Sequence, residues 1–195
     1  MSAAFTQVGE DEVRALIQAF PLAWLVPAGD PGLAQLLPCL PTAGDETLRI
    51  EGHIPLSAPL CTLLEDDPRL TILVLGPNGY VSPRMMNDPR WGPTWNFASV
   101  SLSGTVDFMP GRTGAIVKRL TAHMEGMNDE EWIARRMGDR FDELAQKIVG
   151  FECSIEACRP RFKLGQDEAT DNYGRIAAHF GDSPLGRMMN DRGDA

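Results

Sequence analysis

The side chains best suited to bind metal ions or act as nucleophiles are few and scattered. The cysteines are Cys39, Cys61, Cys153 and Cys158, and the histidines are His53, His123 and His179. No two cysteines form a CxxC pair, and no histidine lies near a cysteine at metal-ligand spacing. We therefore predict no metal site and four buried thiols. No acid, base or nucleophile constellation identifies a reaction.

A second group of polar side chains is suited to phosphate binding. His53 lies at the end of a predicted strand over 47–54, and Ser57 and Thr62 follow in a predicted helix over 57–64 that Ser57 caps. Hydroxyls and the free backbone N–H groups of a first helical turn hold phosphates in many proteins. The alternative for His53 is a surface histidine on the polar face of its strand.

The elements that position these residues are predicted mainly by alternation of apolar and polar side chains. The clearest strand is 98–108, and further strands are predicted at 22–26, 34–40, 47–54, 70–75 and 151–157. Gly104, midway along the longest strand, predicts the bend that lets a sheet curl into a barrel. Trp95 and Phe97 reverse the alternation, which requires a bulge or a second buried face, and we expect a subunit interface there.

Helical spacing predicts helices between and after these strands. They cover 11–20, the stretch from 111, a segment opening at the capping-box pattern 128–131, and 170–180. Strands with intercalated helices predict an α+β fold with an antiparallel barrel. Because no linker-like stretch interrupts the sequence, we expect one domain over 1–180 and a flexible C-terminal tail over 181–195.

Composition and charge limit the partners. The 195 residues are 43% hydrophobic, enough for one sizeable core, and no apolar run approaches membrane-spanning length. The first ten residues lack the features of a signal peptide, so we expect a cytoplasmic protein without membrane contact. The formal net charge of −9 repels nucleic acid, so DNA binding would require a basic surface gathered by a dimer.

Four sequence blocks, in order across nearly the whole chain, resemble the PaiB-like family of FMN-binding negative transcriptional regulators. The first is similar to PLATLV, the second to GHxARANP, the third to GPxAYVSP followed by PTWNY, and the fourth to IVGxE with KLSQN. In this chain the blocks are 21–26, 52–59, 76–83 with 93–97, and 148–152 with 163–167. The third is the strongest match.

This resemblance implies a split β-barrel, related to the pyridoxamine-phosphate oxidase barrels, that forms a homodimer and holds FMN in clefts between its subunits. It implies that His53, Ser57 and Thr62 contact the phosphate and that Tyr80 or Trp95 borders the ring. It also implies polar contacts at the ring edge, and a cleft closed by Lys163 and Gln166. The candidate cofactor-binding residues are His53, Ser57, Thr62, Tyr80, Ser82, Arg84, Thr94, Trp95, Asn96, Lys163 and Gln166.

The chain departs from the family pattern at the proposed phosphate contact. Leu56 stands where the family has arginine, and Ala58 stands where it has asparagine, so a cation that would meet the phosphate is missing. Arg84 or Arg90 would substitute for that charge. In the last block, Gly165 and Asp167 replace serine and asparagine.

Each candidate also has an ordinary structural interpretation. Trp95 is equally explained as a core or interface aromatic, Lys163 as a solvated surface residue, and the segment 80–83 as a turn after a buried strand. Three functions follow. The first is an FMN-binding protein, with oxidoreductase activity on a small substrate. The second is a PaiB-like transcriptional regulator without catalysis, which binds DNA, and the third is a degenerate barrel that has lost FMN.

Overall fold

The computed structural model describes residues 5–44, 47–86, 88 and 90–193. Its strands are β1 (Leu22–Pro27), β2 (Gln35–Pro41), β3 (Arg49–Pro55), β4 (Arg69–Val81), β5 (Thr94–Phe108) and β6 (Ile148–Lys163). Its α-helices are α1 (Glu10–Ala19), α2 (Pro59–Asp66), α3 (Thr113–Met124), α4 (Trp132–Met137), α5 (Asp139–Ala145), α6 (Thr170–Phe180) and α7 (Pro184–Gly193). Short 3-10 helices occupy Pro31–Leu33, Pro83–Met85 and Pro110–Arg112.

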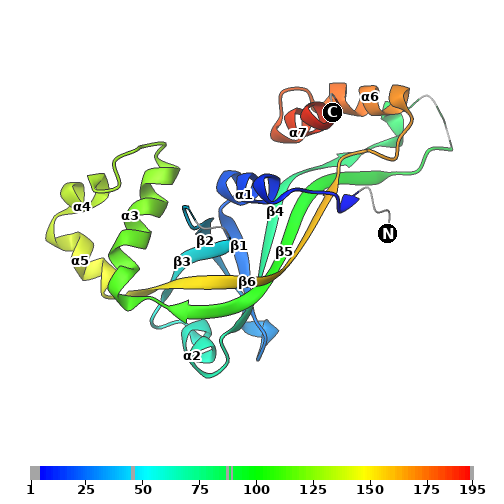
Figure 1. Cartoon of the computed structure of the whole chain (residues 1–195). Coiled ribbons are helices and arrows are strands. Elements are labelled where there is room, and N and C mark those ends of the chain that lie inside the picture. The colour runs from blue at the N-terminus through cyan, green and yellow to red at the C-terminus, as the bar shows by residue number, and fades with distance from the viewer. Residues whose placement is uncertain (1–4, 45–46, 87, 89, 194–195) are drawn as a thin grey trace. The chain divides into compact units, whose positions relative to one another are not determined.

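The six strands close into an antiparallel barrel in the order β1-β2-β3-β6-β5-β4 (Figure 1). Strand β1 pairs with β2 on one side and with β4 on the other, and Trp24 lies opposite both Leu36 of β2 and Leu73 of β4. This architecture confirms the predicted α+β class, an antiparallel split β-barrel with flanking helices. Among the described residues, no helix has the length and apolar character needed to cross a membrane.

Contacts divide the chain into two compact units. Unit 1 contains Met1–Leu16, Leu75–Val100 and Arg159–Ala195, and unit 2 contains Ile17–Val74 and Ser101–Cys158. The strands β4, β5 and β6 continue from one unit into the other. For this reason the division is no test of the single domain expected over 1–180, which stays a prediction.

The interior of unit 2 is filled by inward-facing aliphatic and aromatic residues of the barrel. Those that are fully buried include Leu25, Ile50, Ile72, Leu102 and Phe151. Gly104 lies where β5 approaches β6 closely, because a Cβ atom built there would be 2.0 Å from the carbonyl oxygen of Ser154. Only glycine permits this approach, which accounts for its place in the middle of a long strand.

The outer face of β3 is covered by α3, contrary to the half-exposed strand predicted from the sequence. Leu40, Ile116 and Leu120 form a buried apolar cluster beneath this helix. Glu51, which the alternation placed on a polar face, is only 3% exposed. Alternation identifies which side chains share a face of a strand but not which element covers that face.

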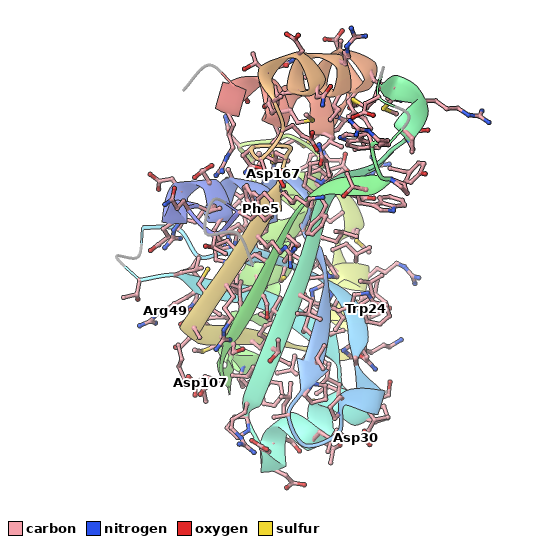
Figure 2. All side chains as sticks on the ribbon, turned by 90° about the vertical axis from the view of Figure 1, so that its right-hand side faces the viewer. Phe5, Trp24, Asp30, Arg49, Asp107 and Asp167 are labelled. Carbon is pink, nitrogen blue, oxygen red and sulfur yellow. The ribbon has the colours of Figure 1, made fainter. Side chains whose placement is uncertain are left out.

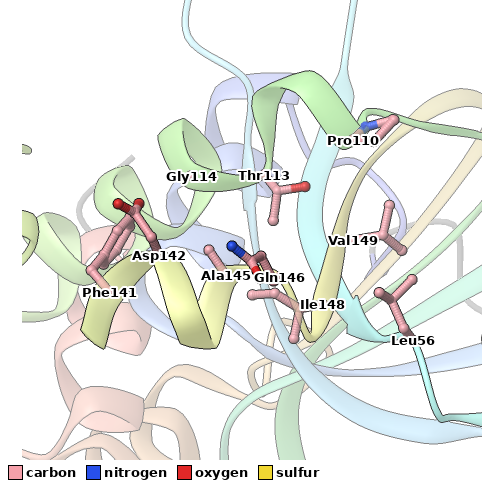
Figure 3. A pocket seen from close by; sticks show the side chains of 10 residues that line it. All are labelled: Leu56, Pro110, Thr113, Gly114, Phe141, Asp142, Ala145, Gln146, Ile148 and Val149. Atoms are coloured by element: carbon pink, nitrogen blue, oxygen red, sulfur yellow. The ribbon is translucent and has the colours of Figure 1, made fainter. Parts of the chain in front are cut away.

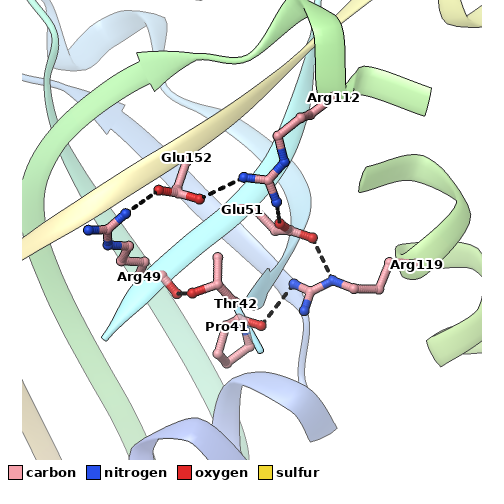
Figure 4. A network of polar contacts seen from close by, with 7 residues as sticks. All are labelled: Pro41, Thr42, Arg49, Glu51, Arg112, Arg119 and Glu152. Carbon is pink, nitrogen blue, oxygen red and sulfur yellow. Dashed lines mark hydrogen bonds and ion pairs between the residues drawn. The ribbon is translucent and has the colours of Figure 1, made fainter. Parts of the chain in front are cut away.

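Two buried carboxylates under α3 are neutralised by three arginines (Figure 4). Glu51 of β3 and Glu152 of β6 are direct cross-strand partners, an arrangement that destabilises a sheet when both are charged and unpaired. Arg112 bridges them, with Nη1 3.2 Å from Glu152 and Nη2 3.4 Å from Glu51. Arg49 binds Glu152 at 2.8 Å, and Arg119 pairs with Glu51 and donates to the carbonyl of Pro41. We call these five charged residues the charge network.

Unit 1 contains a helix where the sequence predicted a flexible tail. Helix α6 has the predicted bounds, and α7 follows it over Pro184–Gly193, with Leu185 and Met189 buried. The Tyr173 hydroxyl of α6 donates a hydrogen bond to the backbone carbonyl of Met189. The apolar positions of α7 are few, so its amphipathic pattern is weak in a polar sequence.

Three local predictions are corrected by the structure. Cys158 is exposed, whereas Cys39, Cys61 and Cys153 are buried as expected. Helix α2 begins one residue later than predicted, so its N-cap is Ala58 rather than Ser57. Helix α4 begins after Glu131, not at the capping-box pattern of 128–131, because the intervening turn is not helical.

Candidate functional site

Unit 1 presents a pair of aromatic rings from neighbouring strands. Tyr80 of β4 and Trp95 of β5 contact each other in a tilted arrangement, with ring centroids 5.8 Å apart and an interplanar angle of 58°. Their side chains remain 46% and 53% exposed, respectively. Large aromatic rings left this open to solvent mark surfaces that bind ligands or other subunits.

The regular alternation of β5 explains why Trp95 faces outward. Asn96, only 1% exposed, takes the inward position that the sequence pattern would give to an apolar residue. Trp95 and Phe97 therefore lie on the outer face, and the Arg161 guanidinium lies 5.6 Å from the Phe97 ring centroid. The alternation is regular here, so no bulge is needed, and the second predicted explanation, a face buried at a subunit interface, stays a prediction.

A cation lies beside this aromatic pair along the chain. The Lys163 ammonium, at the end of β6, donates a hydrogen bond to the hydroxyl of Thr94, which directly precedes Trp95. This contact joins the end of β6 to the start of β5, and an ammonium and a hydroxyl can bind the polar edge of a flat ligand. Four of the predicted ring contacts thus come from the adjacent strands β4, β5 and β6.

Two other candidates in unit 1 stabilise its framework instead of facing solvent. The Asn96 amide donates to the sulfur of Met189 at 3.7 Å. The Gln166 side chain accepts from the backbone N–H of Leu164 at 2.7 Å and donates to the carbonyl of Phe162 at 2.6 Å. These two bonds fix the turn that contains Gly165, whose φ of 87° requires glycine. Asn96 and Gln166 are supporting residues here.

Ser82 and Arg84 lie at the start of the 3-10 helix Pro83–Met85. The Ser82 hydroxyl accepts a hydrogen bond from the backbone N–H of Arg84 at 3.2 Å, so Ser82 is a helix cap. The Arg84 side chain is exposed. Sequence reasoning missed a neighbouring contact in the same unit, in which the Trp91 indole donates to Glu168 at 3.2 Å. No periodicity signals a pair so far apart in the chain.

The three phosphate candidates belong to unit 2. His53 Nδ1 is buried and has no hydrogen-bond partner among the described residues. Burial lowers the pKa of His53 below its usual value, so its imidazole is neutral at pH 7. Ser57 and Thr62 have exposed side chains, on the loop before α2 and on α2 itself.

Leu56 lies next to Ser57 and lines a pocket of about 570 Å³ (Figure 3). The other lining residues are Pro110, Thr113, Gly114, Phe141, Asp142, Ala145, Gln146, Ile148 and Val149. No basic side chain is among them, and the carboxylate of Asp142 would repel an anion. The pocket is therefore unsuited to a phosphate.

Taken unit by unit, the residue types suit FMN: unit 1 has groups for the ring, and unit 2 has polar groups for a phosphate. Tyr80 and Trp95 offer flat apolar walls, and Lys163 with Thr94 offers donors for the dioxo edge. The unpartnered Nδ1 of His53 and the exposed hydroxyl of Ser57 offer polar atoms for the phosphate. At position 56, a leucine that is 51% exposed replaces the cation.

Solved structures share the fold at low sequence identity. The conserved hypothetical protein Rv2991 from Mycobacterium tuberculosis is 16% identical, with a TM-score of 0.60 over 87% of this chain and 96% of that chain. The FAD and heme binding protein from Mycobacterium smegmatis is 16% identical, with a TM-score of 0.61 over 89% of this chain and 79% of that chain. The flavocytochrome Anf3 from Azotobacter vinelandii is 16% identical, with a TM-score of 0.62 over 89% and 78%.

No curated protein matches the chain in sequence. A family model described as "Putative FMN-binding domain" matches residues 1–157, which include all of the sequence blocks except 163–167. A flavin is the cofactor that this match assigns. Since the match spans most of the sequence, the chain belongs to this family of FMN-binding domains.

Proposed function

We propose that this protein is a PaiB-like, FMN-dependent oxidoreductase that acts on a small substrate as a homodimer. The observation that carries the proposal is the exposed Tyr80–Trp95 pair of β4 and β5, together with the Lys163–Thr94 contact between β6 and β5, in a chain of the FMN-binding family. When bound, FMN supplies the electron-transfer chemistry, and the protein supplies binding, orientation and charge. This division of labour agrees with the lack of a catalytic triad or dyad in the sequence.

Each residue of the site has a role in this proposal. Tyr80 and Trp95 border the ring, and Thr94 and Lys163 donate to its dioxo edge. The positive charge of Lys163 would stabilise negative charge on that edge when the ring is reduced. Ser82 and Arg84 shape the adjoining 3-10 turn, while Asn96 and Gln166 keep β5 and the β6 end in place. His53, Ser57 and Thr62 are the phosphate contacts.

The homodimer is supported by an apolar stripe on the outside of the barrel in unit 2. Leu36, Trp24 and Leu73 are cross-strand neighbours on β2, β1 and β4, and all three side chains are more than 40% exposed. Figure 2 shows Trp24 on the outer surface of the barrel. An exposed apolar row of this kind is suited to a two-fold subunit interface, and we propose that it forms one in addition to the interface expected at Trp95 and Phe97.

A second candidate function, a barrel that has lost FMN, is favoured by Leu56 and Ala58. Without the arginine, the phosphate of FMN meets only neutral partners at this position. The two functions differ in affinity: a flavoprotein binds FMN in the micromolar range or tighter, whereas the degenerate barrel does not bind it.

A titration with FMN and riboflavin separates these functions. We expect the purified protein to bind FMN, with a shifted visible spectrum. Leu56→Arg should tighten FMN binding about tenfold, because a charged hydrogen-bond partner for the phosphate is gained, and should leave riboflavin binding unchanged. Ala115→Arg, which adds the same charge on exposed α3, is the control. A protein that takes up neither compound would establish the degenerate barrel.

The oxidoreductase and dimer proposals have separate tests. The rate at which menadione reoxidises the dithionite-reduced holoprotein should saturate as the menadione concentration rises, because an enzyme binds its substrate before the electrons move, whereas the rate for free reduced FMN should not saturate. A rate that does not saturate for the holoprotein would leave binding without catalysis. For the dimer, Trp24→Glu should convert a dimer into a monomer in sedimentation velocity, whereas Trp132→Glu should not. A wild-type monomer would contradict the interface assignment.

A further inference from the structure

The helices α3, α4 and α5 line a second cavity in unit 2, of about 250 Å³. Six of its lining residues are Val117, Thr121, Ile133, Met137, Phe141 and Leu144. The one hydroxyl among these already donates its proton, from Thr121 Oγ1 to the carbonyl of Val117 at 2.8 Å. The space has room for an apolar group, since a cavity of about 150 Å³ admits benzene.

This cavity adjoins the pocket of Figure 3. Phe141, Ala145 and Ile148 line both spaces. Beside this shared wall, the pocket of Figure 3 is lined by the carboxylate of Asp142 and the amide of Gln146, both on exposed residues. Neither side chain has a hydrogen bond or ion pair within the described chain. The two adjoining spaces thus combine an apolar lining with a carboxylate and an amide that are open to solvent.

The charge around the shared wall favours a cation. Asp142 is the charged residue among those that line the two spaces. The ammonium of Lys118, 5.8 Å from the Phe141 ring centroid, is paired with Glu131 at 2.9 Å. An anionic ligand would meet the Asp142 carboxylate, whereas an ammonium would pair with it.

We propose that the α3–α5 module binds a small amphipathic amine, with its apolar body between the three helices and its ammonium at Asp142 and Gln146. The class is a primary amine joined by a short chain to an aromatic or branched aliphatic group. This site lies entirely in unit 2 and shares no residue with the proposed flavin contacts, so it goes beyond the proposed function. Amine binding at this site would make the module a sensor for such compounds.

The probe is 2-phenylethylamine, added to the FMN-saturated protein and followed by the NMR signals of ¹³C-methyl methionine. We expect the Met137 methyl signal, assigned with Met137→Leu, to shift with saturation, while that of exposed Met124 stays in place. The neutral analogue 2-phenylethanol should bind about tenfold more weakly, because it lacks the charge-assisted contact, and 3-phenylpropionate should bind least. Equal binding of all three compounds, or release of FMN by the amine, would overturn the proposal.

Two matched pairs of variants locate the site. Ala145→Leu fills the shared wall and should abolish the Met137 shift, whereas Ala115→Leu adds the same side chain on the exposed face of α3 and should not. Asp142→Asn should weaken the amine about tenfold and leave 2-phenylethanol unaffected, whereas Asp139→Asn should change neither. An unchanged amine affinity in Asp142→Asn would refute the role of Asp142, even if the cavity binds the probe.

Discussion

The charged groups of the two units are used in different ways. In unit 2, the carboxylates of Glu51 and Glu152 are buried and satisfied by Arg49, Arg112 and Arg119. In unit 1, the described contact of the Lys163 ammonium is with the neutral hydroxyl of Thr94, and the aromatic rings of Tyr80 and Trp95 are half exposed.

This difference separates structural charge from functional charge. A buried carboxylate with several guanidinium partners has no capacity left for a ligand, and removing one member leaves the others uncompensated. A cation that meets only a hydroxyl keeps its charge available to an incoming anion or polar edge. The three arginines gathered around Glu51 and Glu152 would by themselves suggest an anion-binding surface in unit 2, and their ion pairs reverse that inference.

The largest expected effect comes from breaking the charge network. Glu51→Ala should lower the free energy of unfolding by about 3–5 kcal/mol, because Arg112 and Arg119 lose a buried partner. Urea denaturation measures this loss. Glu131→Ala removes the exposed pair with Lys118 and should cost at most about 1 kcal/mol. Similar losses in both variants would show that the buried network is no different from a surface pair.

The next effect concerns the aromatic pair. Trp95→Ala should raise the dissociation constant of FMN at least about tenfold, since a stacking ring contributes about 1–3 kcal/mol. Its free energy of unfolding should change by about 1 kcal/mol or less, because the side chain is half exposed. Trp132→Ala, in unit 2, should not affect FMN. An FMN affinity insensitive to Trp95 would remove the functional side of the comparison.

A smaller effect is expected from His53. Its pKa in the folded protein lies below the unfolded value of 6.5, because burial disfavours the charged imidazole. The neutral form therefore stabilises the fold above pH 6.5, and that contribution is lost as the pH falls through the lowered pKa. His53→Asn should flatten the decline in unfolding free energy between neutral and acidic pH. An identical pH profile in the variant would contradict this assignment.

The smallest effect concerns the reactivity of the four cysteine thiols, and it involves no change in the free energy of unfolding. Burial raises the pKa of Cys39 and of Cys153 to about 12, so neither forms a thiolate at pH 8. Cys61 is also buried, with a raised pKa. An aromatic disulfide reagent should modify Cys158 alone in the native protein and all four cysteines in urea. Rapid modification of the Cys158→Ser variant would indicate that the barrel opens.

The sequence predicts the barrel well because its strands alternate and its helices carry apolar stripes. The segment 98–108, for example, lies within β5, and α6 has its predicted bounds. The candidate site is predicted as a set of residues but not by role. Asn96 and Gln166 look like ligand contacts in sequence, yet their partners, Met189 and the backbone of 162–164, depend on tertiary packing. Alternation likewise carries no information on the helix that buries Glu51.

The packing around Gly52 determines what this glycine tells us about relatives. A Cβ atom at this position would lie 2.9 Å from the Phe151 ring and 2.9 Å from the carbonyl oxygen of Pro38, so the barrel interior itself demands glycine. A glycine at this position in a related chain therefore reflects the packing of the barrel interior and gives no information on the ligand that the chain binds. Leu56, four positions onward and open to solvent, is free to vary, so cofactor preference can evolve there without disturbing the barrel.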